Sequence, residues 1–286
     1  MKKYNYKFCF YFLLILNISS LIYIYINKNQ IIPFYRKLTR IYIANKQKTI
    51  YKTTDKKLNS KLNITNKNID SIEFLIKNNS GNKKRIQIIF IGNSISLSFP
   101  NKENQWAGMW GMAATKAEYA YPQVLAKKIA EKLNYEVNSK IFNLSSIALN
   151  RSYPISIIEE INSSKPNVLI IQLGDNISSK YLQIFKKDLE TFLRKLSTQS
   201  CPIIATPFYP SEKKNDIFAE ISSELNYYLV DLSNLISASD NPNKLIAKYE
   251  KVYLDPGVQA HPGDYGMSKI AKQIYPTVQK CLSLNP

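Results

Sequence analysis

Two polar turns along the chain carry the residue types that acyl transfer to a serine needs. Ser94 stands in the run IIFIGNSIS, where a Gly-Asn turn follows a short β-branched segment. The chain contains one histidine, His261, in the Gly- and Pro-rich segment DPGVQAHPGDYGM. A serine hydroxyl is a weak nucleophile until a base takes its proton, and histidine has the unperturbed pKa that suits this task at neutral pH. The pair therefore predicts a serine nucleophile with a histidine base.

A third polar turn, in LIIQLGDNIS, places Asn176 just after another apolar segment. Its side-chain amide could donate to a developing oxyanion, together with backbone N–H groups of Ser94 and of residues 143–150. Each feature also has a simpler interpretation on its own. A serine or asparagine after a strand is often a helix N-cap, and a lone histidine usually has no chemical role.

These turns need a scaffold that brings them together, and the hydrophobic pattern indicates one. Apolar, β-branched runs alternate with segments of helical periodicity, which predicts an α/β fold with a mostly parallel sheet covered on both faces. Ligands of such sheets bind at the carboxyl ends of the strands. The expected strands cover residues 86–92, 136–143, 167–174, 202–208 and 227–233, and the expected helices cover 121–133, 153–163, 182–197, 214–226 and 266–282.

The order and spacing of these turns resemble the SGNH/GDSL hydrolases. GNSIS, 92–96, is similar to the family's first block with Asn93 in place of aspartate; LGDN, 173–176, is similar to the block with the oxyanion asparagine; and DPGVQAHPGDYGM is similar to the last block. The stretch WAGMWGMAATKAEYAYPQVL is similar to a segment of one bacterial subgroup. The resemblance covers about residues 86–284. It implies a three-layer α/β/α, flavodoxin-like sandwich, with oxyanion donors at Ser94, Ala148 and Asn176.

The chain departs from the family at two of these positions. Ala148 stands where the family has a glycine, although a backbone N–H survives that change. The family's triad aspartate, three residues before the histidine, is matched by Val258, which has no acceptor side chain. We expect Asp255 to hydrogen-bond the His261 ring in its place. Asp264 and a backbone carbonyl are the alternatives.

Two tryptophans, Trp106 and Trp110, could form an aromatic platform for a sugar ring, with core packing as the alternative. No GxGxxG, Walker or HExxH pattern is present, so neither a cofactor nor a metal is expected.

The N-terminal third differs in composition from the rest of the chain. Residues 8–26 contain no charge and are long enough to span a bilayer as a helix, which predicts an uncleaved signal anchor in preference to a cleaved signal peptide. Residues 1–85 carry +15 of the formal charge of +18. The predicted organisation is an anchor or signal over residues 1–27, a basic linker over 28–85 and a hydrolase domain over 86–286. Cys201 and Cys281 could pair in an oxidising compartment.

The leading functional prediction is a serine esterase that hydrolyses an O-acyl ester, O-acetyl in the first place, on an envelope or extracellular carbohydrate. The expected location is the cell membrane, with residues 8–26 in the bilayer and the catalytic domain outside the cytoplasm. No nucleic-acid partner is expected. The alternatives are an O-acyltransferase that uses the same site and a non-catalytic envelope interaction protein, which the missing acid at position 258 favours.

Overall fold

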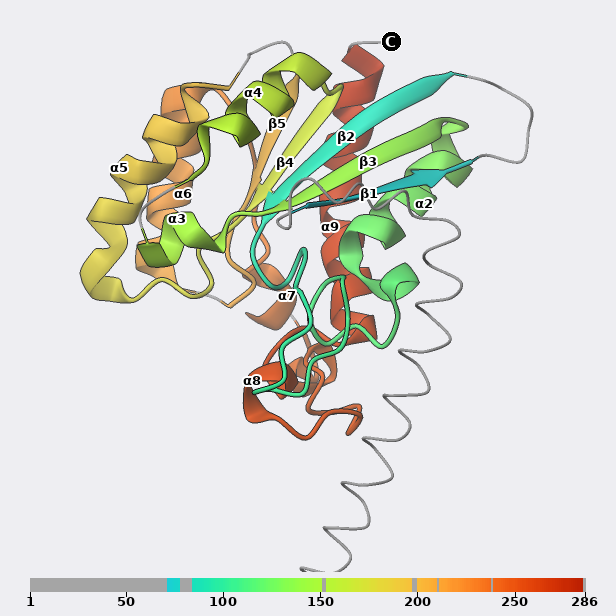
Figure 1. The fold of residues 1–286 in the computed structure, drawn as a ribbon, viewed down its shortest axis with the longest axis vertical. Coiled ribbons are helices and arrows are strands. Elements are labelled where there is room, and N and C mark those ends of the chain that lie inside the picture. The colour runs from blue at the N-terminus through green and yellow to red at the C-terminus, as the bar shows by residue number, and fades with distance from the viewer. Residues whose placement is uncertain are drawn as a thin grey trace, which may run out of the picture. The chain divides into compact units, whose positions relative to one another are not determined.

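The computed structural model describes residues 71–77, 84–150, 153–196, 200–209, 211–237 and 239–284, with only the backbone for residues 148–150 (Figure 1). The predicted anchor at residues 8–26 and most of the predicted linker lie outside these ranges. Within them, no helix combines the length and the apolar character that a membrane span requires.

A six-stranded sheet forms the centre of the described chain, in the order β1-β3-β2-β4-β5-β6. All neighbouring strands are parallel except β1, which pairs antiparallel with β3. The mostly parallel sheet predicted from the sequence is confirmed. The strands are β1 (Ser71–Ile76), β2 (Arg85–Gly92), β3 (Glu136–Asn143), β4 (Val168–Gln172), β5 (Cys201–Ala205) and β6 (Tyr228–Val230).

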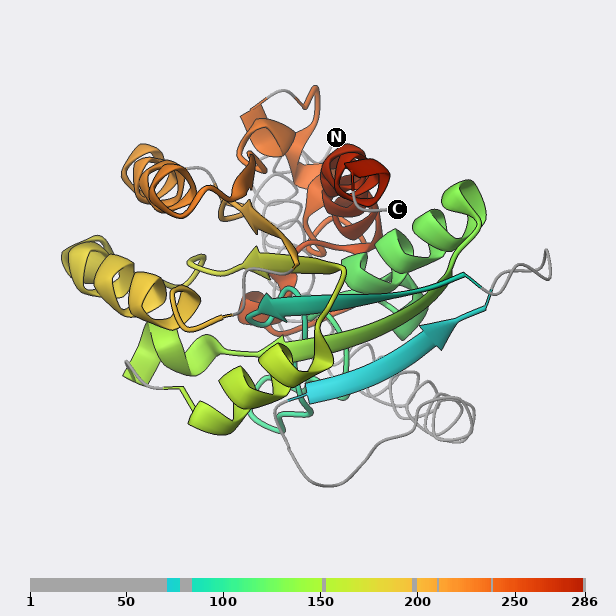
Figure 2. The same cartoon turned by 90° about the horizontal axis from the view of Figure 1, so that it is seen from above.

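Helices cover both faces of this sheet, as Figure 2 shows from above. One apolar cluster joins one face of the sheet to α2 and α9, and a second joins the opposite face to α4, α5 and α6. The central strand β2 contributes to both clusters, with Ile88 through Ile91 fully buried, as expected for a parallel strand covered on both sides. The helices are α2 (Tyr121–Leu133), α3 (Ser145–Asn150), α4 (Ile155–Ser164), α5 (Leu182–Leu193), α6 (Glu212–Leu225), α7 (Asn234–Ser237), α8 (Pro256–Gln259) and α9 (Asp264–Leu284).

The edge strand β1 is a correction to the predicted linker over residues 28–85. Its residues pair with β3 from Ser71 opposite Phe142 to Ile76 opposite Val137. Ile72 and Phe74 are buried while their neighbours are more exposed, which is the alternation of a strand with one covered face. The sheet therefore begins before residue 86.

The carboxyl ends of the central strands lie side by side. Gly92 of β2 stands opposite Asn143 of β3 and Gln172 of β4, and Gln172 stands opposite Ala205 of β5. The polar turns that follow these strands therefore share one edge of the sheet.

Three short 3₁₀ helices complete the described chain: η1 (Ala117–Tyr119), η2 (Ser179–Tyr181) and η3 (Pro242–Leu245).

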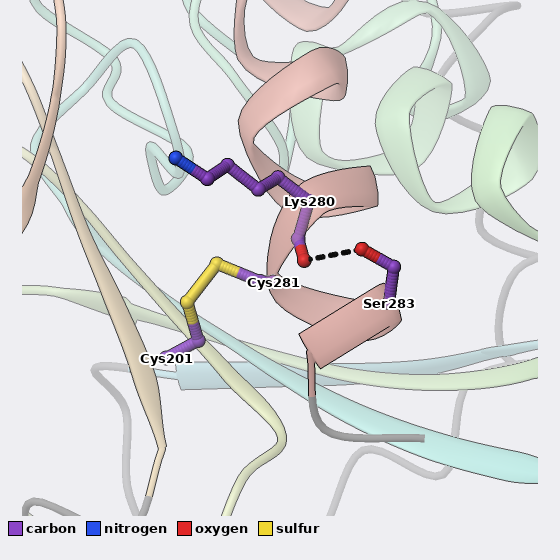
Figure 3. The surroundings of a disulfide bond; sticks show 4 residues. All are labelled: Cys201, Lys280, Cys281 and Ser283. Carbon is purple, nitrogen blue, oxygen red and sulfur yellow. Dashed lines mark hydrogen bonds between the residues drawn. A yellow bond between two sulfur atoms is a disulfide. The ribbon is translucent and has the colours of Figure 1, made fainter.

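A disulfide joins Cys201, the first residue of β5, to Cys281 near the end of α9, with a Cα–Cα distance of 5.8 Å (Figure 3). Both cysteines are buried. The bond ties the far end of α9 to the amino end of the sheet, so the start of α9 lies at the opposite, carboxyl edge. The pairing that the sequence left open is thus formed in the structure.

Candidate active site

The nucleophile turn, residues 92–97, places Ser94 just beyond the carboxyl end of β2. Gly92 ends the strand where a Cβ would lie 1.9 Å from Ser96 Oγ, so glycine is required there. The three N–H groups that follow Ser94 all donate to Asn93, two to its carbonyl at 2.9 Å and one to its side-chain oxygen at 3.2 Å. Asn93 is buried, and its role is to close the turn that holds Ser94 at the sheet edge.

Two further hydrogen bonds anchor the nucleophile turn to the chain after β2. The Ser94 carbonyl accepts from the N–H of Met112 at 2.7 Å. The Ser96 hydroxyl lies 2.8 Å from the hydroxyl of Tyr121, the first residue of α2. Burial raises the pKa of Tyr121, so this phenol stays neutral and serves as a structural partner.

The serine and the histidine meet directly. Ser94 Oγ lies 2.7 Å from His261 Nε2, and His261 Nδ1 lies 2.7 Å from the carbonyl oxygen of Gly257. A carbonyl only accepts, so Nδ1 of the neutral ring carries the proton and Nε2 accepts from the serine hydroxyl. This is the tautomer that a general base needs, and the distance is within the reach that proton transfer requires.

The base loop, residues 255–264, contains α8 and His261. The predicted hydrogen bond from the His261 ring to the Asp255 carboxylate is wrong, because Nδ1 donates to the carbonyl oxygen of Gly257. Asp255 is instead the N-cap of α8, where its Oδ1 accepts from the N–H of Val258 at 3.0 Å. An aspartate followed by proline is a good helix start, and this local role competes with any role at the imidazole. The third alternative, a backbone carbonyl, is the arrangement observed.

Asp264, the other acid considered, also has a different partner. Its carboxylate accepts from the backbone N–H of Thr115 at 2.7 Å and from the Thr115 hydroxyl at 2.5 Å. It therefore fixes the segment before α2 to the start of α9, and it is not the partner of the His261 ring.

The electrostatics of His261 favour its neutral form. Burial lowers the pKa of His261 below its usual 6.5, while the Gly257 carbonyl and the charge of Asp255 act in the opposite direction. The ring is thus a free base at neutral pH. Because Asp255 acts through its charge, it would stabilise a protonated His261 ring without touching it.

Oxyanion donors would have to come from the turns beside Ser94. In the nucleophile turn the N–H groups of residues 95–97 are all bonded to Asn93, which leaves the Ser94 N–H as the candidate donor. Ala148 is the fourth residue of α3, where an α-helix uses the N–H for its own hydrogen bond. The predicted donor Ala148 is therefore poorly placed.

The start of α3 offers a better donor than Ala148. Among its first N–H groups, that of Leu144 donates to Gly92 O at 2.7 Å, that of Ser145 to Asn143 Oδ1 at 3.0 Å and that of Ile147 to Leu144 O at 3.1 Å. Of the N–H groups of residues 144–147 in the described chain, that of Ser146 is the one without an acceptor. Residue 146 lies within the segment 143–150 that was predicted to supply a backbone donor, and it is a better candidate than residue 148.

Asn176 follows β4, the neighbour of β2, and its side chain is exposed at the carboxyl edge. Gly174 makes this turn possible, because it has φ +98° and a Cβ there would lie 2.8 Å from the Phe218 ring. The structure thus brings Asn176 to the same edge as Ser94 and His261, as predicted, in a turn that does not use it as the N-cap of α5.

The predicted sugar platform of Trp106 and Trp110 is wrong. Both side chains belong to the core, with only 3% and 6% of their surface exposed. Their rings meet edge to face at 5.6 Å, and the indole N–H of Trp110 donates to the carbonyl of Ala114 at 2.8 Å. Neither ring has a free face, so these tryptophans stabilise the segment after the nucleophile turn and do not stack on a substrate.

Two further residues near the site, Tyr209 and Asp175, were not predicted from the sequence. Tyr209 donates its hydroxyl to the carbonyl of Ala260, the residue before His261. Asp175, next to Asn176, accepts backbone N–H groups of the segment that carries Tyr209. Their signal in the sequence is only their position, since each closely follows a buried strand.

Comparison with known proteins gives a similarity of fold. No protein-family model and no curated protein sequence matches the chain. Among solved structures the chain is similar to the lipase/acylhydrolase from Enterococcus faecalis, with 15% identity over 68% of this chain and 96% of that chain and a TM-score of 0.48.

Two further solved structures are similar to the chain at about the same level of identity. The chain is similar to a family 3 carbohydrate esterase from Clostridium thermocellum, with 15% identity over 70% of this chain and 99% of that one and a TM-score of 0.46. It is also similar to a Bacteroides uniformis protein described as a GDSL-like lipase, with 14% identity over 68% and 96% of the two chains and a TM-score of 0.46. These values concern the general fold, and the chemistry has to come from the site.

Proposed function

We propose that this chain is a serine ester hydrolase with Ser94 as nucleophile and His261 as general base. One observation carries the proposal: Ser94 Oγ lies 2.7 Å from His261 Nε2 while Gly257 O holds the opposite ring nitrogen at 2.7 Å. Serine with a base of the correct tautomer is the arrangement of acyl transfer. Burial keeps the pKa of His261 low, so the base is neutral at the pH where it must accept a proton.

The proposed reaction has two steps. Ser94 Oγ attacks the carbonyl carbon of the ester while its proton passes to His261 Nε2, and the Ser94 N–H, the Ser146 N–H and the Asn176 amide are the candidate donors to the oxyanion. His261 then protonates the departing alcohol as the C–O bond breaks, which leaves an acyl group on Ser94. In the second step His261 takes a proton from water, whose oxygen attacks the acyl carbon. The bond from that carbon to Ser94 Oγ then breaks while His261 returns the proton to Oγ, which releases the acid and the free serine.

The substrate we propose is an O-acyl ester, O-acetyl in the first place, on an envelope or extracellular carbohydrate. The family resemblance of the sequence blocks and the predicted anchor at residues 8–26 support this class. The Cys201–Cys281 disulfide supports a location outside the cytoplasm, because disulfides persist in oxidising compartments. The proposed location is the membrane surface, with the catalytic domain outside the cytoplasm.

The test is labelling of the full chain with a fluorophosphonate, which reacts with activated serines. We expect the native chain to be labelled, Ser94→Ala to show no labelling, and Ser283→Ala to label like the native chain. Ser283 is a suitable control because it is a serine at the end of α9 that lies away from His261, bonded to the carbonyl of Lys280 (Figure 3). A native chain that resists the probe would favour the non-catalytic alternative.

A series of p-nitrophenyl acyl esters then gives the preferred acyl length, with the fastest turnover expected for acetyl. Adding a sugar alcohol to this assay separates the two enzymatic possibilities. A hydrolase releases acetate at an unchanged rate, whereas an acyltransferase gives the acylated sugar as its main product.

A further inference from the structure

Tyr209 joins the segment after β5 to the base loop. It lies four residues beyond Ala205, the last residue of β5, and its hydroxyl donates to the carbonyl of Ala260. Ala260 immediately precedes His261. The tyrosine thus holds the backbone of the base loop one residue away from the imidazole.

The other end of Tyr209 is fixed by a carboxylate. Asp175 Oδ1 accepts the N–H groups of Phe208 at 2.8 Å and of Tyr209 at 3.3 Å, and Asp175 Oδ2 accepts from the Gln172 side chain at 2.7 Å. Burial raises the pKa of Asp175, and the bonds from Gln172, Tyr209 and Phe208 and the charge of Lys214 oppose this rise. Both carboxylate oxygens are therefore used to hold Tyr209 against β4.

The same carboxylate belongs to the turn that carries Asn176. Lys214 donates to the carbonyls of Gly174 at 2.9 Å and of Asp175 at 2.8 Å, which fixes this turn from α6. The contacts from Asn176 through Asp175, Tyr209 and Ala260 to His261 form a continuous path. The other end of the path is the Ser94 hydroxyl, bonded to His261.

We propose that Tyr209 is a positioning residue for His261 that ties the base loop to the turn of Asn176 through Asp175. The proposal rests on the proposed function of Ser94 and His261. Its physical reason is the nature of the partner of Nδ1. A carboxylate side chain would follow the ring by rotating about its own bonds, but the Gly257 carbonyl is part of the backbone. The ring orientation therefore depends on where the backbone of the base loop lies. Tyr209 helps to set that position, together with the N–H groups of Ala247 and Lys248, which donate to the carbonyls of His261 and Gln259.

The first test compares Tyr209→Phe with the native chain and with Tyr227→Phe. Tyr227 is a matched control, because its hydroxyl also donates to a backbone carbonyl, that of Leu193 at 3.4 Å, on the amino side of β6. We expect Tyr209→Phe to lower kcat and the fluorophosphonate labelling rate roughly tenfold, as for the loss of one hydrogen bond, with KM nearly unchanged. Tyr227→Phe should leave all three unchanged.

The second test uses the single histidine of the chain. In protein purified without a polyhistidine tag, the NMR signals of the imidazole belong to His261 alone, so its pKa can be measured without a substrate. Burial lowers this pKa in the native chain, and a loosened base loop would admit water. We expect the pKa of His261 to move up toward 6.5 in Tyr209→Phe and to stay in place in Tyr227→Phe.

These readouts separate the failure of each proposal. If the native chain is not labelled but Tyr209→Phe still shifts the His261 pKa, the proposed function fails and the positioning role stands. If Tyr209→Phe matches the native chain in labelling rate, kcat and His261 pKa, the positioning role is overturned. An activity loss with an unshifted pKa and a melting temperature lowered equally in both variants would also overturn it, since the loss would then be one of general stability.

Discussion

The nucleophile turn and the base loop are held in place in different ways. Ser94 is fixed by contacts among its immediate neighbours, since residues 95–97 all bond to Asn93. His261 is fixed from a distance: its carbonyl accepts from Ala247 at 2.9 Å, and the preceding residue bonds to Tyr209. The nucleophile turn is thus closed by its own residues and then anchored at Met112 and Tyr121, whereas the backbone around His261 is held by contacts from Ala247 and Tyr209. Changes far from the site should therefore affect the base more than the nucleophile.

The disulfide offers the largest test of this difference. It closes a segment with a sequence separation of 80 that contains the base loop and excludes the nucleophile turn. Loop-closure entropy predicts that the double variant Cys201→Ser/Cys281→Ser loses about 4.5 kcal/mol of unfolding free energy. Urea unfolding of the native chain and the variant measures the loss.

The same preparations contain the control, because a reducing agent should lower the midpoint of the native chain and leave the double variant unchanged. Native-state hydrogen exchange should quicken first in α9 and in the base loop. Equal midpoints with and without the disulfide would show that packing alone holds α9. The base loop would then depend no more on distant contacts than the nucleophile turn does.

Two glycines, one in each region, give the next largest effect. A Cβ on Gly92 would lie 1.9 Å from Ser96 Oγ and 3.1 Å from the carbonyl oxygen of Gln172. On Gly257 it would meet only Asp255 Oδ1, at 3.0 Å. We expect Gly92→Ala to cost about 2 to 3 kcal/mol of stability and most labelling, as an overpacked site does. Gly257→Ala should change stability by less than ~1 kcal/mol. The comparison fails if the two variants unfold at the same denaturant concentration.

The contrast also explains which features could be predicted from the sequence. The strands with continuous apolar runs, such as residues 86–92, and the turn with Ser94 were predicted because their signals are local. The edge strand Ser71–Ile76 was missed because its six residues lie in a Lys- and Asn-rich stretch that has the composition of a linker. Its alternation of apolar and polar residues can be assigned to a buried and an exposed face only once the strand is seen to pair with β3.

The errors at the site have a similar cause. The string DPGV has the pattern of an N-cap followed by proline, and this local pattern describes the role of Asp255. The Gly257 carbonyl carries no mark in the sequence, because every residue has one. Likewise, Trp106 and Trp110 look the same in a sequence whether they line a surface or fill a core, and only packing decided between the two.

The pH dependence tests the burial of the base. The proposed reaction needs neutral His261, whose pKa is lowered from its usual 6.5 by burial, so the labelling rate should reach its plateau at a lower pH than with an ordinary histidine and fall as the pH drops through the lower folded value. Between those two values the unfolded chain binds a proton that the folded chain does not, so stability also falls as the pH decreases. His261→Gln, which lacks this proton, is the control for the stability measurement. An acid limb at or above 6.5 would contradict a buried base.

Asp255 gives the smallest expected effect and the sharpest test of how the base is oriented. Asparagine is as good an N-cap as aspartate, so Asp255→Asn should keep α8 and the Gly257 carbonyl in place, whereas Asp255→Ala should lose about 1 kcal/mol. The charge of Asp255 raises the pKa of His261, so Asp255→Asn should lower that pKa and reduce turnover by less than roughly tenfold. Steady-state kinetics and the NMR titration of His261 measure both changes.

A loss of several orders of magnitude in Asp255→Asn would mean that the carboxylate reaches the imidazole during the reaction. Turnover close to native in the asparagine variant, with a clear loss in the alanine variant, is the result expected if Asp255 acts by holding the backbone that holds the ring.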